Sequence, residues 1–114
     1  MKRPLAYITA PWGDDEIDNR EKAARYCRHV YDAGYSPVCP VLMYPAFLKH
    51  DVPQEVRDRA DMSNELLRRS KLLVVCGKVS TDEVKGDIAL AKHMHIAATT
   101  LEGVMVVDGA SKKE

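Results

Sequence analysis

Three carboxylates, those of Asp82, Glu83 and Asp87, stand close together in the stretch "VSTDEVKGDIALAK" at residues 79–92. This stretch follows "KLLVVCG" (71–77), an apolar run typical of a central parallel strand covered on both faces. A strand end followed by a turn and a helix start is where α/β proteins place their ligands. One carboxylate could therefore be a catalytic group. The alternative is that all three are ordinary charges at the positive end of a helix.

Alternating strand-like and helix-like segments are expected to position these carboxylates. Short β-prone runs predict strands at 4–9, 35–41, 71–77 and 96–101, and 103–109 is either a further strand or a C-terminal extension. Helical periodicity predicts a helix at 15–33 that ends at Gly34. Pro53 is expected to open a second helix that runs to about residue 70, with a loop or one-turn helix at 42–51 before it. Ser80 and Glu83 predict a capping box for a third helix, to about residue 95.

This order predicts an α/β fold: a single Rossmann-like, flavodoxin-like domain at 1–110, followed by a frayed tail at 111–114. We expect a parallel sheet of four or five strands with helices on both faces, and the two prolines in 35–41 indicate an edge strand. Ligands of such sheets bind at the carboxyl ends of the strands, here at "TAPWGDD" and "GKVSTDE". The chain has neither GxGxxG nor GxxxxGK[ST], so we expect no cofactor.

Composition excludes several classes of protein. The 114 residues contain 17 basic and 17 acidic side chains, a balance that argues against a general nucleic-acid binder. Three widely spaced cysteines without a CxxC motif indicate reduced, buried thiols, and the four histidines do not pair with them at zinc spacing, so no metal is expected. No apolar run has the length of a membrane span, and no secretory signal is evident. We therefore expect a soluble, cytoplasmic protein without a membrane partner.

Four segments together resemble the nucleoside 2-deoxyribosyltransferase-like superfamily, in particular its small uncharacterised bacterial and phage members. They are "AYITAPWGD", "ARYCRHVYDAGYSPVCPVLMYPAFL", "MSNELLRRSKLLVVCG" and "VKGDIALAKHMHI". The resemblance implies a Rossmann-like fold, which agrees with the pattern of elements. It also implies a reaction in which a glutamate attacks C1′ of a deoxyribonucleoside, the base leaves, and another base or water takes the sugar.

The resemblance assigns roles to individual residues. The nucleophile position falls on Asp87, and Tyr7 is similar to the tyrosine that steadies the nucleophile in the enzymes. Substrate-binding roles fall on Pro11, Trp12, Gly13, Asp14, Ser63 and Asp82. Two of these have structural alternatives: Asp82, like Glu83, fits a helix-start charge, and Trp12 fits packing as well as base stacking.

The family site is also altered in this chain. Asp87 stands where the enzymes have glutamate, the turn "STDEVKG" lacks the usual glycine, and Ser63 and Lys71 replace two acidic residues. Two functions follow. One is an N-glycosidase or deoxyribosyltransferase, and the other is a non-catalytic small-molecule-binding or interaction module with the same fold. A weaker third is a phosphate or NAD-derived ligand at "PWGDD".

The family also bears on partners. A nucleoside or nucleotide is the expected small-molecule partner. The superfamily enzymes are oligomers that complete their sites across an interface, so a homodimer or dimer-based assembly is expected. The apolar loop around Tyr44 and Phe47 would serve as a substrate lid or as that interface.

Overall fold

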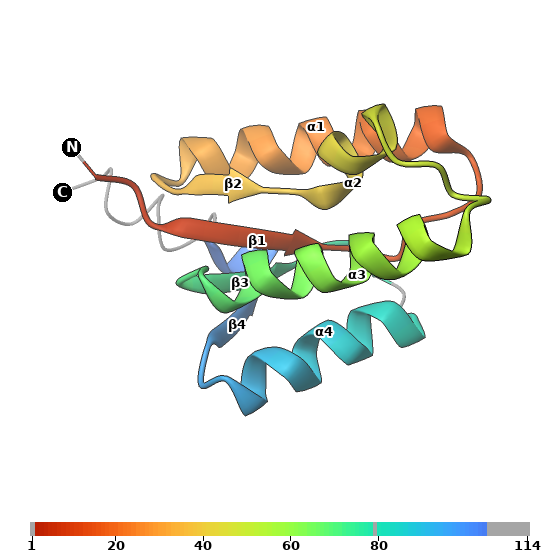
Figure 1. Ribbon diagram of the computed structural model, residues 1–114. Coiled ribbons are helices and arrows are strands. Elements are labelled where there is room, and N and C mark those ends of the chain that lie inside the picture. The colour runs from red at the N-terminus through yellow and green to blue at the C-terminus, as the bar shows by residue number, and fades with distance from the viewer. Residues whose placement is uncertain (1, 79, 105–114) are drawn as a thin grey trace, which may run out of the picture.

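Four parallel strands form one sheet in the order β2-β1-β3-β4 (Figure 1). The computed structural model describes residues 2–78 and 80–104. The strands are β1 (Leu5–Thr9), β2 (Ser36–Val38), β3 (Leu72–Val75) and β4 (Ala97–Thr100). The helices between them are α1 (Glu16–Asp32), α2 (Pro40–Met43), the 3-10 turn η1 (Tyr44–Ala46), α3 (Pro53–Arg68) and α4 (Asp82–His93). The predicted α/β fold with a parallel sheet is confirmed.

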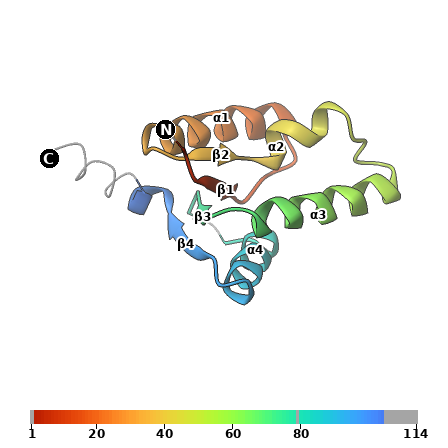
Figure 2. The ribbon, with the colours of Figure 1, turned by 60° about the vertical axis from the view of Figure 1, so that its left-hand side comes forward.

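Helices cover both faces of the sheet, with α1 on one side and α3 and α4 on the other (Figures 1 and 2). Side chains of β1 alternate between the two layers. Ile8 packs into a cluster with Ala23 and Val30 of α1, whereas Tyr7 packs with Leu67 of α3 and Ala91 of α4. A strand buried on both faces has this pattern.

Residues at the helix ends correctly predicted most of the helix boundaries. Asp15 caps α1 by accepting a hydrogen bond from the backbone N–H of Asp18 at 3.1 Å. Gly34 follows the helix end with a φ of +98°, a left-handed conformation in which glycine has no Cβ penalty. Pro53 is the first residue of α3, and β2 lies at an edge of the sheet, as predicted.

Three local predictions were wrong. The strand predicted at 35–41 is only Ser36–Val38, because Pro40 cannot donate to a ladder and instead begins α2. The cap of α4 is Thr81, which accepts from the backbone N–H of Val84 at 3.3 Å, so the capping box predicted from Ser80 is displaced by one residue. The alternative strand at 103–109 is contradicted at its start, since residues 101–104 are helical. Its remainder and the tail predicted at 111–114 lie outside the described residues.

The three cysteine thiols are free, with Cys39 and Cys76 buried and Cys27 half-buried. Burial raises the pKa of the Cys76 thiol to about 12. A hydrogen bond with Cys27, together with burial, raises the pKa of Cys39 as well. Cys39 and Cys76 are therefore neutral, inert core groups at ordinary pH.

No helix within residues 2–78 and 80–104 combines the length and the apolar character that crossing a membrane requires. The predicted absence of a membrane-spanning segment therefore agrees with this part of the chain.

Candidate functional site

A cavity of about 650 Å³ opens at the carboxyl end of β1, beside the start of α2 and the helices α3 and α4. This is the topological switch point of the sheet, because the chain leaves β1 through α1 on one face and reaches β3 through α3 on the other. Two side chains with hydroxyl groups, Tyr7 and Thr9, lie at the floor of the cavity. Two side chains with carboxyl groups, Glu83 and Asp87 of α4, lie at one wall. A cavity of this size and position holds a small molecule in many α/β proteins.

The strongest polar contact in the cavity joins Thr9 to Asp87. The Thr9 hydroxyl donates to Oδ2 of Asp87 at 2.7 Å, a length typical of a bond to a charged oxygen. Thr9 is only 3% exposed and sits on the rigid first strand, so it fixes the carboxylate by its Oδ2 atom. Oδ1 has no hydrogen bond among the described residues and is free to meet a ligand.

The surroundings of Asp87 disfavour its charge. Burial raises the pKa of the Asp87 carboxyl, the hydrogen bond from Thr9 lowers it in part, and the nearby Glu83 carboxylate raises it again. Carboxyl groups that are half-buried in a cleft and have a shifted pKa occur frequently at functional sites. An ordinary helix-start charge, by comparison, is solvated and needs no partner from another strand.

The raised pKa of Asp87 predicts that its ionised form destabilises the folded protein at neutral pH. The folded state favours the protonated carboxyl of Asp87, because the folded-state pKa is raised. The contribution of this carboxyl to the free energy of unfolding is therefore complete below the unfolded pKa and is lost as the pH rises through the folded pKa. Asp87→Asn, which keeps the acceptor for Thr9, should therefore raise the melting temperature at pH 7 by about 2–5 °C. The gain should disappear below the unfolded pKa, near pH 4. Thermal melts between pH 3 and 8 check this, and a gain that is equal at every pH would contradict it.

Tyr7 lies on the same side of β1 as Thr9 and is 5% exposed. Burial raises the pKa of its hydroxyl strongly, the Asp87 charge raises it further, and a hydrogen bond with Ser63 acts in the opposite direction. Tyr7 therefore stays protonated. Its coupling to Asp87 is electrostatic, and among the described residues the hydrogen bond to Asp87 comes from Thr9 rather than from Tyr7. Sequence reasoning did not single out Thr9, and the positioning role that the resemblance assigned to Tyr7 stays a prediction.

Removal of the Thr9 hydroxyl should change the titration of Asp87. Thr9→Val keeps the shape of the side chain but deletes the donor, so the pKa of Asp87 should rise above its value in the unmodified protein. Carboxyl chemical shifts of Asp87, followed by NMR through a pH titration, measure this directly. Thr9→Ser, which retains a hydroxyl, is the matched control. An unchanged titration in Thr9→Val would show that the Thr9 hydroxyl does not hold the carboxylate.

The loop after β1 forms a second wall and is held by Asn19 of α1. The Asn19 side chain accepts from the backbone N–H of Gly13 at 3.0 Å and donates to the Gly13 carbonyl at 2.8 Å. This two-bond clamp fixes the loop that carries Trp12, Gly13 and Asp14 into the lining. Asn19 also lines the cavity, and its role depends on a contact between segments that the sequence pattern did not reveal.

The third wall carries two cationic side chains, those of Lys49 and Arg59, and one carboxylate, that of Glu55. Lys49 and His50 precede α3, and the half-buried Arg59 projects from it into the same lining. Glu55 holds the entry to α3, since its carboxylate accepts from the backbone N–H of Lys49 at 2.9 Å. The cavity thus has a carboxylate end at Asp87 and a cationic side at Arg59, an arrangement suited to a ligand with one polar reacting centre and one anionic group.

The predicted site residues divide by location. The lining of this cavity contains Tyr7, Trp12, Gly13, Asp14, Ser63 and Asp87. Pro11 and Trp12 line a neighbouring cavity, whereas Asp82 is exposed in the first turn of α4 and lines neither. Lys71 lies just before β3, at the amino end of the sheet, so its replacement of an acidic residue does not alter the cavity.

The apolar loop predicted as a lid or subunit interface folds into α2 and η1. Leu48 reaches the cavity lining, while Phe47 is 65% exposed and stacks edge-on against Tyr44. Both of its predicted roles stay predictions.

Metal binding has no support in the described part of the chain, where no three His, Cys, Asp or Glu side chains lie close enough to hold an ion.

Comparison with known proteins gives a family. Residues 4–101 match the family model described as a domain of unknown function, DUF7768. The chain belongs to the DUF7768 family. The match begins just before β1 and extends beyond β4, so every residue of the cavity lies inside the family domain. No curated protein matches the sequence.

Proposed function

We propose that this DUF7768 protein binds a nucleoside or nucleotide and cleaves or transfers at its N-glycosidic bond, with Asp87 as the nucleophile. The observation that carries the proposal is the Asp87 carboxylate in an open cavity, fixed at one oxygen by Thr9 and free at the other. The resemblance of "VKGDIALA" to the nucleophile segment of the nucleoside 2-deoxyribosyltransferase-like superfamily supports the same residue.

The reaction follows from this arrangement. Oδ1 of Asp87 attacks C1′ of the sugar, the C1′–N bond breaks, and the base leaves with the bonding electrons and takes up a proton. The glycosyl ester formed on Asp87 is then attacked at C1′ by water or by a second base, which frees the carboxylate. Asp87 must be ionised to attack, so its raised pKa implies that activity falls as the pH is lowered through that pKa.

The neighbouring groups would act on the substrate in defined ways. Tyr7 stays protonated and offers a hydroxyl beside Asp87, suited to the ring oxygen or a sugar hydroxyl. Trp12 offers an aromatic face that a base can stack on. Arg59, with Lys49 before the start of α3, provides cations for a phosphate.

The test is direct. The protein is incubated with each deoxynucleoside and its 5′-monophosphate, and free base is followed by chromatography, with Asp87→Ala as the control. Base release that requires Asp87 supports the proposal. Release no faster than in the Asp87→Ala control, for every substrate, would exclude it.

The cationic wall predicts a preference for the monophosphate. Arg59→Gln should lower kcat/KM for the deoxynucleoside 5′-monophosphate by about 10- to 100-fold, because it removes a charge-assisted contact. The rate with the unphosphorylated nucleoside should change little. Arg57→Gln on the outer side of α3 is the matched control, since Arg57 is exposed and outside the lining. An equal loss with both substrates would mean that Arg59 does not contact a phosphate.

A non-catalytic module is the second candidate, and one observation favours it. Glu83 lines the cavity beside Asp87, and its charge opposes the ionisation of the nucleophile. Calorimetric titration separates the two functions. Binding of a nucleotide without release of base would support the module, whereas turnover would exclude it.

A further inference from the structure

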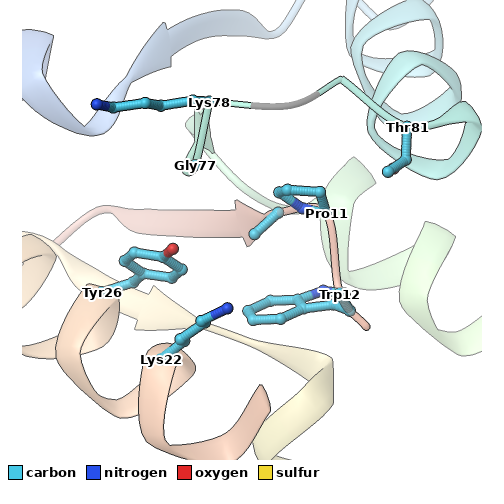
Figure 3. Close-up of a pocket in the computed structure, with 8 residues that line it drawn as sticks. Pro11, Trp12, Lys22, Tyr26, Gly77, Lys78 and Thr81 are labelled. Atoms are coloured by element: carbon cyan, nitrogen blue, oxygen red, sulfur yellow. The ribbon is translucent and has the colours of Figure 1, made fainter. Parts of the chain in front are cut away.

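A second cavity, of about 420 Å³, lies on the α1 side of the loop that follows β1. Its walls come from three segments: the loop 10–12, the segment after β3, and one face of α1. The lining consists of Ala10, Pro11, Trp12, Lys22, Tyr26, Gly77, Lys78 and Thr81. Figure 3 shows Lys22 and Tyr26 reaching up from α1 toward Trp12 and Pro11, with Gly77 and Lys78 on the opposite side.

The floor of this cavity depends on a glycine. Gly77 has a φ of +83°, and a Cβ at this position would lie 2.8 Å from Cδ of Pro11, closer than real Cβ contacts allow. The segments after β1 and β3 therefore touch at Pro11 and Gly77, and the position tolerates only glycine without a shift of one segment. Ala10, which also lines the cavity, is 2% exposed and belongs to the core on the α1 side of the sheet.

The lining combines aromatic surface with positive charge. The Trp12 and Tyr26 rings lie 6.1 Å apart between centroids at an angle of 47°, and both are half-buried. Lys22 and Lys78 both belong to the lining, but in Figure 3 only the Lys22 ammonium points toward the Trp12 ring, while the Lys78 side chain extends away from it. The lining holds no carboxylate among the described residues. Lys22 also pairs with Asp18 at 3.0 Å, but both side chains are nearly half exposed, and such pairs contribute little. The Lys22 ammonium, which points toward the Trp12 ring in Figure 3, remains available to an anion.

From this lining we propose that the second cavity is a binding site for a small planar aromatic anion, a ring that bears a carboxylate, phosphate or phosphonate group. The ring packs against Trp12, Tyr26 and Pro11, and the anionic group lies at the Lys22 ammonium. The site is separate from the Asp87 cavity and shares only Trp12 with it. It therefore does not depend on the glycosidic reaction.

The experiment uses phenylphosphonate as the probe, since it carries a ring and an anion but has no glycosidic bond to cleave. Trp12 is the only tryptophan of the chain, so its fluorescence and its single indole N–H resonance report on the site. We expect saturable quenching, with amide shifts at Gly77 and Tyr26. Inorganic phosphate, an anion without a ring, and benzyl alcohol, a ring without an anion, should each bind at least about tenfold more weakly.

Variants separate this site from the Asp87 cavity. Lys22→Gln combined with Lys78→Gln should weaken phenylphosphonate binding about tenfold or more, because the charge-assisted contact of Lys22 and the remaining positive charge of the lining are lost. Lys85→Gln, at an exposed lysine of α4 outside both linings, is the matched control and should bind normally. The proposal is overturned by unchanged binding in the double variant. Shifts that map to Arg59 and Ser63 instead, or no binding at about 10 mM probe, would also overturn it.

Discussion

Asp87→Asn is expected to reduce base release from deoxynucleosides by more than about 1,000-fold, because the amide cannot form the glycosyl ester. The fold should be retained, since Asn still accepts the hydrogen bond from Thr9. The same variant is predicted above to be more stable at pH 7. A variant that gains stability and loses activity is the expected behaviour of a group kept in an unfavourable place for a reaction. Single-turnover base release and thermal melts on one preparation measure both properties.

Asp82→Asn provides the matched control. It makes the same chemical change on the same helix, but Asp82 is exposed and outside both cavities, so the rate should change by less than about twofold. Asp87→Glu is the informative third variant. It restores the residue type of the enzymes that the sequence resembles, yet its longer side chain no longer matches the Thr9 hydroxyl, so the rate should fall by up to about 100-fold. Equal rates in Asp87→Asn and the unmodified protein would remove Asp87 from the mechanism.

Leu67→Ala should produce the largest loss of stability, about 2–5 kcal/mol of the free energy of unfolding. Leu67 is fully buried and joins α3 to the sheet through Tyr7 and Leu73. Loss of its side chain leaves a cavity under the helix that also carries Ser63 and Arg59, so ligand affinity should fall together with stability. Most domains have a free energy of unfolding of only about 5–15 kcal/mol, so this loss is a large part of the total. Urea unfolding followed by circular dichroism gives the value.

Leu42→Ala is the control for Leu67→Ala. The residue type is the same, but Leu42 is 38% exposed at α2, so its truncation should cost no more than about 1 kcal/mol. If the two variants unfold at the same urea concentration, the packing of α3 on the sheet does not depend on the contact of Leu67 with Tyr7 and Leu73.

Local chemistry predicted most of the fold. Asp15 and Gly34 mark the two ends of α1, Pro53 marks the start of α3, and the apolar run at 71–77 marks the central β3. Each of these signals acts within a few residues, so it can be read without knowledge of distant segments. The wrong predictions of helix and strand ends also differ from the structure by only a few residues. Ser80 and Thr81 are both good helix caps, and the sequence could not decide which hydroxyl would face the first turn of α4.

The candidate site was predictable only in part. Trp12 was singled out because the loop after β1 lies at the carboxyl edge of a parallel sheet, and Asp87 was singled out from its neighbours by the family resemblance. Thr9, Asn19 and Arg59 were not singled out, since no local pattern distinguishes a threonine that ends a strand or an arginine on a charged helix. Their roles come from contacts between distant segments, such as that of Thr9 with Asp87, which lies 78 positions later in the chain.

The sequence by itself determined the parallel α/β order, the edge strand β2 and the position of a carboxylate after the central strand. Those features depend on hydrophobic period, proline and glycine, whose effects are local. Only the tertiary structure decided that Thr9, rather than Tyr7, holds Asp87, that Asp82 lies outside the cavity and that Lys71 lies at the other end of the sheet. Hydrogen bonding and burial depend on which segments meet in space, and that is fixed when α3 and α4 pack on the same face of the sheet.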